Sequence, residues 1–107
     1  MPTPETQKVL GALGLCRKAG KTVLGTDAVC EALRGDPRPC AVFAAGDNSE
    51  NTNKRLRDKC ATYAVPLRTL PVSGEELAAA LGKSARTASV AVTDENLCRL
   101  VLSRLES

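Results

Sequence analysis

Histidine and tryptophan are absent from the chain, and other aromatic residues are scarce. Phe43 and Tyr63 are the only two among 107 residues. Without histidine, the commonest general base near neutral pH is missing, so we expect the protein not to be an enzyme. With so few aromatic rings, a platform on which unpaired bases stack is also poorly supported.

Paired metal ligands and targeting segments are missing as well. The five cysteines (Cys16, Cys30, Cys40, Cys60 and Cys98) form no C-x-x-C pair, and no histidine could complete a zinc site. We interpret them as reduced, mostly buried thiols and expect neither a metal nor a cofactor. No run approaches the roughly 18 apolar residues of a spanning helix. The first residues do not resemble a secretory signal, so a cytoplasmic location is expected.

The residues that are present suit one compact core. The length of 107 residues and the apolar fraction of 43% are typical of a single domain. No linker, repeat or low-complexity tract divides the chain, and we expect one domain over residues 1–107. Short apolar runs alternate with stretches of helical periodicity, which is typical of an α/β protein.

The periodic stretches and their flanking residues place the expected elements. Thr3 and Pro4 favour a helix start, Ser73 and Glu76 form a capping box, and Thr93 is the expected cap of the last helix. Helices are expected over residues 4–20, 25–35, 50–63, 75–81 and after 93, with strands at 22–24, 40–45, 66–70 and 88–92. Helices on both faces of a four-stranded sheet predict a three-layer α-β-α sandwich. The pattern leaves strand order and direction open.

The positive charge is unevenly distributed. The net charge is only +3, yet residues 8–21 hold four basic residues and no acidic one, and residues 54–59 hold four against Asp58. Such clusters can neutralise phosphates. Two solvated helix faces would give the same pattern, so charge alone leaves both interpretations open.

The segment from Gly14 to Thr22 resembles a phosphate-binding loop because it ends in Gly20-Lys21-Thr22. Five residues separate its glycines, however, where the motif has four. The segment is also expected to end a helix and open a strand, which is the reverse of the loop's usual context. A nucleotide-binding enzyme that uses Lys21 and Thr22 is therefore the second alternative.

A series of short motifs supports a different identification. They are LCRKAGK at 15–21, GTD at 25–27, AAGD at 44–47 and VAVTD at 90–94. Their order and spacing resemble the kink-turn-binding ribosomal protein family, and within it a bacterial YlxQ-like branch, over about residues 8–105. The resemblance implies a mixed sheet in an α-β-α sandwich. It also implies non-catalytic binding of structured RNA, in a ribosomal or translation-related ribonucleoprotein with possible protein partners.

In that family, the glycine-led start of the second helix enters the RNA through a G-x-N-E-x-x-K motif. Free amide groups and the helix dipole favour an anion at such a start. Gly25 matches the motif, but Asp27 stands at the asparagine position, Ala28 replaces the glutamate and Glu31 replaces the lysine. Asp27 can accept a hydrogen bond from guanine but cannot donate one. Recognition of a kink-turn itself is therefore left open.

The second family contact is the loop before the last strand, here residues 83–89, where Arg86 is expected to face the RNA. An ordinary connecting loop would look the same. The predicted RNA-binding residues are Arg17, Lys18, Gly20, Lys21, Gly25, Thr26, Asp27, Lys54, Arg55, Lys83 and Arg86. We expect the basic ones to gather around the start of the second helix. A protein-interaction module on the same fold is the first alternative, because several motif positions are lost.

Overall fold

The computed structural model describes residues 3–106, so residues 1, 2 and 107 of the expected domain lie outside the described part. Helices and strands alternate along it. The elements are α1 (Pro4–Lys18), β1 (Thr22–Leu24), α2 (Thr26–Leu33), β2 (Ala41–Ala45), α3 (Glu50–Thr62), β3 (Leu67–Leu70), α4 (Gly74–Ala80), β4 (Ser89–Val92) and α5 (Glu95–Glu106). These bounds agree closely with those expected from the sequence.

The strands form one mixed sheet in the order β1-β4-β2-β3. Strand β4 runs antiparallel to both of its neighbours, and β2 and β3 are parallel. The predicted four-stranded mixed sheet is confirmed, and the order and directions that the pattern left open are now defined. The central strands β2 and β4 are buried along their whole length, as their continuous apolar runs indicated.

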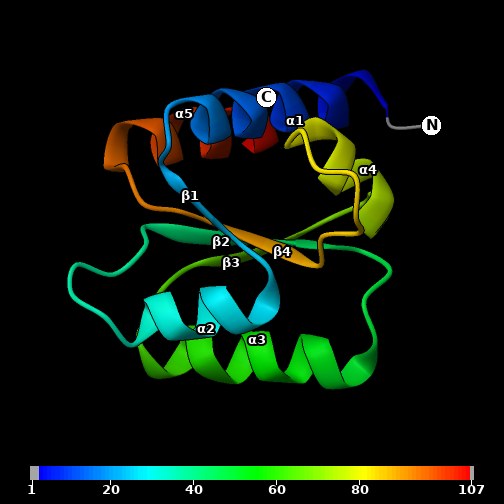
Figure 1. The fold of residues 1–107 in the computed structure, drawn as a ribbon. Helices are drawn as coiled ribbons and strands as arrows, with labels where there is room; N and C mark the ends of the chain where they lie inside the picture. The colour runs from blue at the N-terminus through cyan, green and yellow to red at the C-terminus, as the bar shows by residue number, and fades with distance from the viewer. Residues whose placement is uncertain (1–2, 107) are drawn as a thin grey trace.

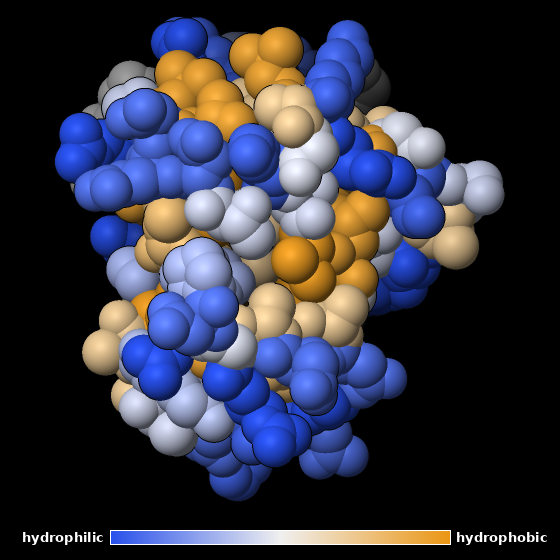
Figure 2. All heavy atoms as spheres, turned by 60° about the vertical axis from the view of Figure 1, so that its left-hand side comes forward, coloured by the Kyte–Doolittle hydropathy of each residue, from blue (hydrophilic) through white to orange (hydrophobic). Residues whose placement is uncertain are grey.

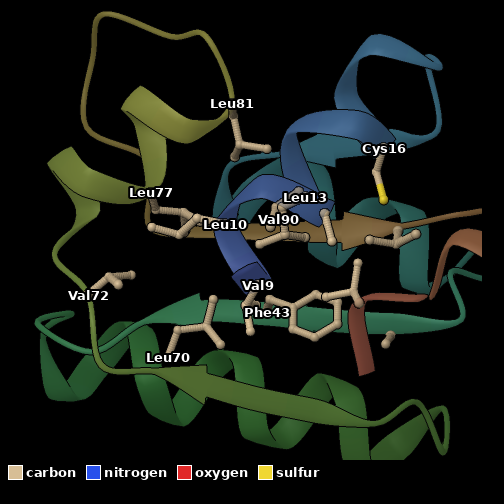
Figure 3. Close-up of a cluster of buried hydrophobic side chains, with 14 of the residues drawn as sticks. Val9, Leu10, Leu13, Cys16, Phe43, Leu70, Val72, Leu77, Leu81 and Val90 are labelled. Carbon is tan, nitrogen blue, oxygen red and sulfur yellow. The ribbon is translucent and has the colours of Figure 1, made fainter. Parts of the chain in front are cut away.

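Helices cover both faces of this sheet (Figure 1), which confirms the α-β-α sandwich. Helices α1, α4 and α5 lie on one face, and α2 and α3 lie on the other. Alternate residues of β2 point to opposite faces, so Phe43 joins the core under α1 and α4 while Val42 joins the core over α2 and α3. In Figure 3, side chains of α1 and α4 gather with Phe43 and Val90 in the larger of these cores.

Helix caps follow the sequence in all but one case. The Thr3 hydroxyl accepts from the Thr6 amide, and Ser73 and Glu76 form the expected capping box. The expected cap at Thr93 is wrong, because the carboxylate of Asp94 accepts from the Leu97 amide at 2.9 Å. The Thr93 amide instead donates to the Lys21 carbonyl at 2.9 Å. Thr93 thus still belongs to the sheet's hydrogen-bond network, and the cap of α5 lies one residue later, at Asp94.

The described surface is mainly polar. On the face in Figure 2, hydrophobic residues show as patches along the upper part and across the middle, and hydrophilic residues cover most of the rest. Within residues 3–106, no helix is long and apolar enough to cross a membrane. All five cysteines are free thiols, four of them buried and Cys40 partly so. No group of acidic, cysteine or histidine side chains in this part of the chain is arranged to hold a metal ion.

Candidate nucleic-acid interface

The start of α2 is an open backbone surface built around Gly25. This residue has φ 93° and ψ 147°, a backbone conformation that residues other than glycine rarely adopt. Its amide donates to the Ser89 carbonyl at 3.0 Å, which fixes the turn against β4. No side-chain hydrogen bond caps the helix, and a Cβ atom at Gly25 would meet nothing within 4 Å. The first amides of α2 can therefore be approached from solvent.

Arg55 of α3 reaches this helix start. Its Nη1 donates to Oδ1 of Asp27 at 2.6 Å, and the side chains are 48% and 92% exposed. The hydrogen bond with Asp27 raises the pKa of Arg55. Helix α3 therefore brings Arg55 to the start of α2. The carboxylate that stands in place of the family's asparagine is neutralised by a guanidinium from another helix.

Lys54, the neighbour of Arg55, is paired within its own helix. Its Nζ donates to Oδ2 of Asp58 at 2.6 Å, one helical turn away. The hydrogen bond with Lys54 lowers the pKa of Asp58. Lys54 and Arg55, the two basic residues predicted to bind RNA from α3, therefore each form an ion pair with an acidic residue of the same protein.

Arg86 ties the loop before β4 to the rest of the domain. Its Nη2 donates to Oδ1 of Asp47 at 2.6 Å and lies 3.3 Å from Oδ1 of Asn48. The same Asp47 oxygen accepts from the Gly74 amide at 3.0 Å, and Arg86 lies so close to Gly74 that a Cβ atom there would overlap it. The RNA contact expected of Arg86 stays a prediction. Asp47 and Asn48 hold this loop in place, a role that no motif in the sequence indicated.

The basic residues at the end of α1 do not gather at the start of α2, so that expectation is wrong. Strand β1 separates Lys21 from Gly25, and four extended residues span about 13 Å. Figure 1 shows the end of α1 and the start of α2 at opposite ends of β1. Gly20, with φ 72°, ends α1 as expected, and the Lys21 amide donates back to the Cys16 carbonyl at 3.0 Å.

The unpaired positive charge accordingly lies away from Gly25. Arg17 and Lys18 line a groove between α1 and α4, and Lys83 follows Gly82 at its other side. Within the described chain, no ion pair includes Arg17, Lys18, Lys21 or Lys83. The predicted site is therefore divided into a neutralised group at α2 and a free cationic group near α1 and α4.

The Gly20-Lys21-Thr22 sequence does not form a phosphate-binding loop. It ends a helix and opens β1, where Thr22 pairs with Val92 of β4. A phosphate-binding loop follows a strand and opens a helix, so that its amides point toward the phosphates. The order of elements here is the reverse.

Comparison with known proteins gives one family and two curated relatives. Residues 7–101 match the model of the ribosomal protein L7Ae/L30e/S12e/Gadd45 family. The chain is 38% identical over 94 residues to RNA-binding protein YlxQ of Bacillus subtilis (strain 168), covering 88% of this chain and 91% of that protein. It is 36% identical over 77 residues to RNA-binding protein YlxQ of Enterococcus faecium, covering 72% and 73%.

Two solved structures share the fold. A protein with unknown function from Bacillus halodurans C superposes with a TM-score of 0.84 at 27% identity, covering 94% of this chain and 98% of that one. The Giardia lamblia 15.5kD RNA binding protein superposes with a TM-score of 0.77 over 99% of this chain and 88% of its own. At 15% identity, the second likeness concerns the fold alone.

Proposed function

The chain belongs to the ribosomal protein L7Ae/L30e/S12e/Gadd45 family, and from this we propose that it binds structured RNA without catalysing a reaction. Its similarity to two RNA-binding YlxQ proteins supports this assignment and confirms the YlxQ-like resemblance of the motifs. We further propose that the RNA is ribosomal or otherwise translation-related and that the protein acts in the cytoplasm.

The observation that carries the proposal is the open start of α2. The glycine-led turn at Gly25 presents free amides and the positive end of a helix to solvent. Arg55 neutralises Asp27, so the carboxylate there repels a phosphate less than an unpaired one would. Arg55 also keeps further N–H groups that can donate to a guanine edge or a phosphate.

The separate cationic group favours an extended, structured ligand over a single nucleotide. Lys21 and Gly25 lie about 13 Å apart along β1, so one ligand that contacts both must span that distance. Phosphate contacts from Arg17, Lys18, Lys21 and Lys83 would supply most of the affinity. The shape of the RNA would supply most of the selectivity.

Binding to a set of matched RNAs tests the proposal. Fluorescence anisotropy would compare a labelled kink-turn RNA, a regular duplex of similar length and composition, and a single strand, each over a series of salt concentrations. We expect tighter binding to the structured RNAs and a steep loss of affinity with salt. Absence of binding to all three at low salt would contradict RNA binding. Equal binding to the kink-turn and the duplex would agree with binding of structured RNA and would show that this RNA need not contain a kink-turn.

A further inference from the structure

Helices α1 and α4 pack side by side over the sheet and leave a groove between their outer sides. In Figure 3, Leu10 and Leu13 of α1 point into the core beneath the helices. Leu77 of α4 and Leu81 point into the same core. Leu81 and Gly82 directly follow α4, and together with that helix they are called the α4 segment. The groove has a volume of about 380 Å³. Its lining consists of Leu10, Gly11, Gly14, Leu15, Arg17, Lys18, Ala79, Ala80, Leu81 and Gly82.

The floor of the groove is aliphatic and combines leucines with glycine and alanine. Leu15, 54% exposed, is the one exposed large hydrophobic residue of the described chain. A single exposed leucine is ordinary on a protein surface. Here, however, it lies in a concave lining of glycine and alanine, where a partner's side chain could contact it on several sides. A Cβ atom at Gly14 would lie 3.0 Å from the Ala80 carbonyl oxygen, so the two backbones approach closely.

The rim of the groove is positively charged and uncompensated. Arg17 and Lys18 belong to the lining, and Lys83 directly follows Gly82. The lining contains no acidic residue, and none of the ion pairs within residues 3–106 involves these three cations. A complementary ligand therefore combines aliphatic groups with negative charge.

We propose that this groove, lined by α1 and the α4 segment, binds an acidic segment of a partner protein. An aliphatic side chain of the segment would pack against Leu15, and its carboxylates would pair with Arg17 and Lys18. A protein segment fits this groove better than RNA because it can offer an aliphatic side chain to Leu15, which a sugar-phosphate backbone lacks. This proposal rests on the proposed function in one respect: Arg17, Lys18 and Lys83 are also the proposed phosphate contacts, so the acidic segment would compete with RNA for this rim.

Gly11 allows the groove to be filled without disturbing the fold. A Cβ atom at this position would meet nothing within 4 Å, and leucine is a better helix former than glycine. The variant Gly11→Leu should therefore fold at least as well as the natural chain. Its side chain would occupy the groove. A second variant, R17E combined with K18E, reverses the rim charge.

Selection from a phage-displayed library of random peptides, followed by anisotropy with the enriched peptides, tests the proposal. We expect acidic peptides that contain leucine, isoleucine or valine, with binding weakened roughly tenfold or more by either variant. Lys8→Glu, on the same helix but outside the groove lining, is the matched control and should keep most of the peptide affinity.

Two results would overturn the proposal. One is that no such peptide is enriched, or that Gly11→Leu binds the enriched peptides as well as the natural chain does. The other is that Gly11→Leu weakens RNA binding instead, which would assign the groove to RNA. RNA affinity is measured in parallel on the same variants. RNA binding itself is tested on the natural chain, so its failure can be distinguished from failure of the peptide proposal.

Discussion

Asp27 and Arg55 lie 28 positions apart in the sequence and form a hydrogen bond of 2.6 Å at the start of α2. Asp27 is also the residue that departs from the asparagine of the family motif. The departure is therefore compensated inside the protein, since the added negative charge meets a positive one. A motif comparison along one helix does not include this partner.

Replacing Asp27 by asparagine should strengthen RNA binding. The substitution removes a negative charge from the α2 start, releases Arg55 and adds an amide that can donate. We expect a several-fold gain in affinity at low salt, measured by anisotropy, and little change in the urea midpoint because exposed ion pairs contribute little to stability. Glu95→Gln in α5, which removes a carboxylate paired with Arg99, is the control. Weaker binding by Asp27→Asn would mean that the carboxylate itself contacts the RNA.

Replacing both Lys18 and Lys21 by alanine should reduce affinity and its dependence on salt. Each lost phosphate contact should lower the slope of log affinity against log salt by roughly 0.7–0.9. Lys54→Ala should have a smaller effect, because Lys54 is paired with Asp58. Lys8→Ala provides a control for the loss of one exposed charge on α1. An unchanged slope in the double variant would remove these two lysines from the interface.

Replacing either of two glycines with open surroundings by alanine should change the free energy of unfolding, in opposite directions for the two positions. Gly25→Ala places a side chain at φ 93° and should lower the free energy of unfolding by about 1–3 kcal/mol. Gly11→Ala lies inside α1 and should raise it by about 0.5–1 kcal/mol, because alanine favours the helix. Urea denaturation measures both. If Gly25→Ala is as stable as the natural chain, the turn does not need glycine.

Stability should decline in alkaline solution because of two buried thiols. Burial raises the pKa of Cys60 and of Cys98 from the ordinary value of 9.0 to about 11. The unfolded chain therefore loses these protons first. The stabilising contribution is complete below pH 9 and is lost as the pH rises through about 11.

Urea denaturation across that pH range measures this loss. The double variant Cys60→Ala, Cys98→Ala serves as the comparison, because its other titrating groups are the same. Its free energy of unfolding should start lower, owing to the smaller core side chains, but should fall less between pH 9 and 11. Parallel curves for the two proteins would show that these thiols do not cause the alkaline decline.

The fold was largely predictable because its determinants are local. Helical periodicity, helix caps and the apolar runs of β2 and β4 can each be recognised within a short segment of the sequence. At Thr93 two adjacent residues are both of a capping type, and Asp94 rather than Thr93 accepts from the Leu97 amide. Strand order was open because it depends on long-range pairing, which no local rule includes.

The candidate site was less predictable because it depends on distances between elements. Gly25 was recognisable from its motif. The pairing of Arg55 with Asp27 depends on how α3 packs beside α2, and the groove depends on the packing of α1 against α4. The expected gathering of basic residues failed because charges were grouped by sequence, without the length of the strand between Lys21 and Gly25.

The central position of β4 has a consequence for synthesis of the protein. Strand β4 is the last of the four strands along the chain but lies between β1 and β2, and its Ser89 carbonyl accepts from the Gly25 amide. A nascent chain leaves the ribosome with its N-terminus first. It therefore cannot complete either the sheet or the Gly25 turn until residues 89–92 have been synthesised. The α2 surface thus matures only after β4 has been synthesised, so that premature termination before β4 leaves a fragment without it.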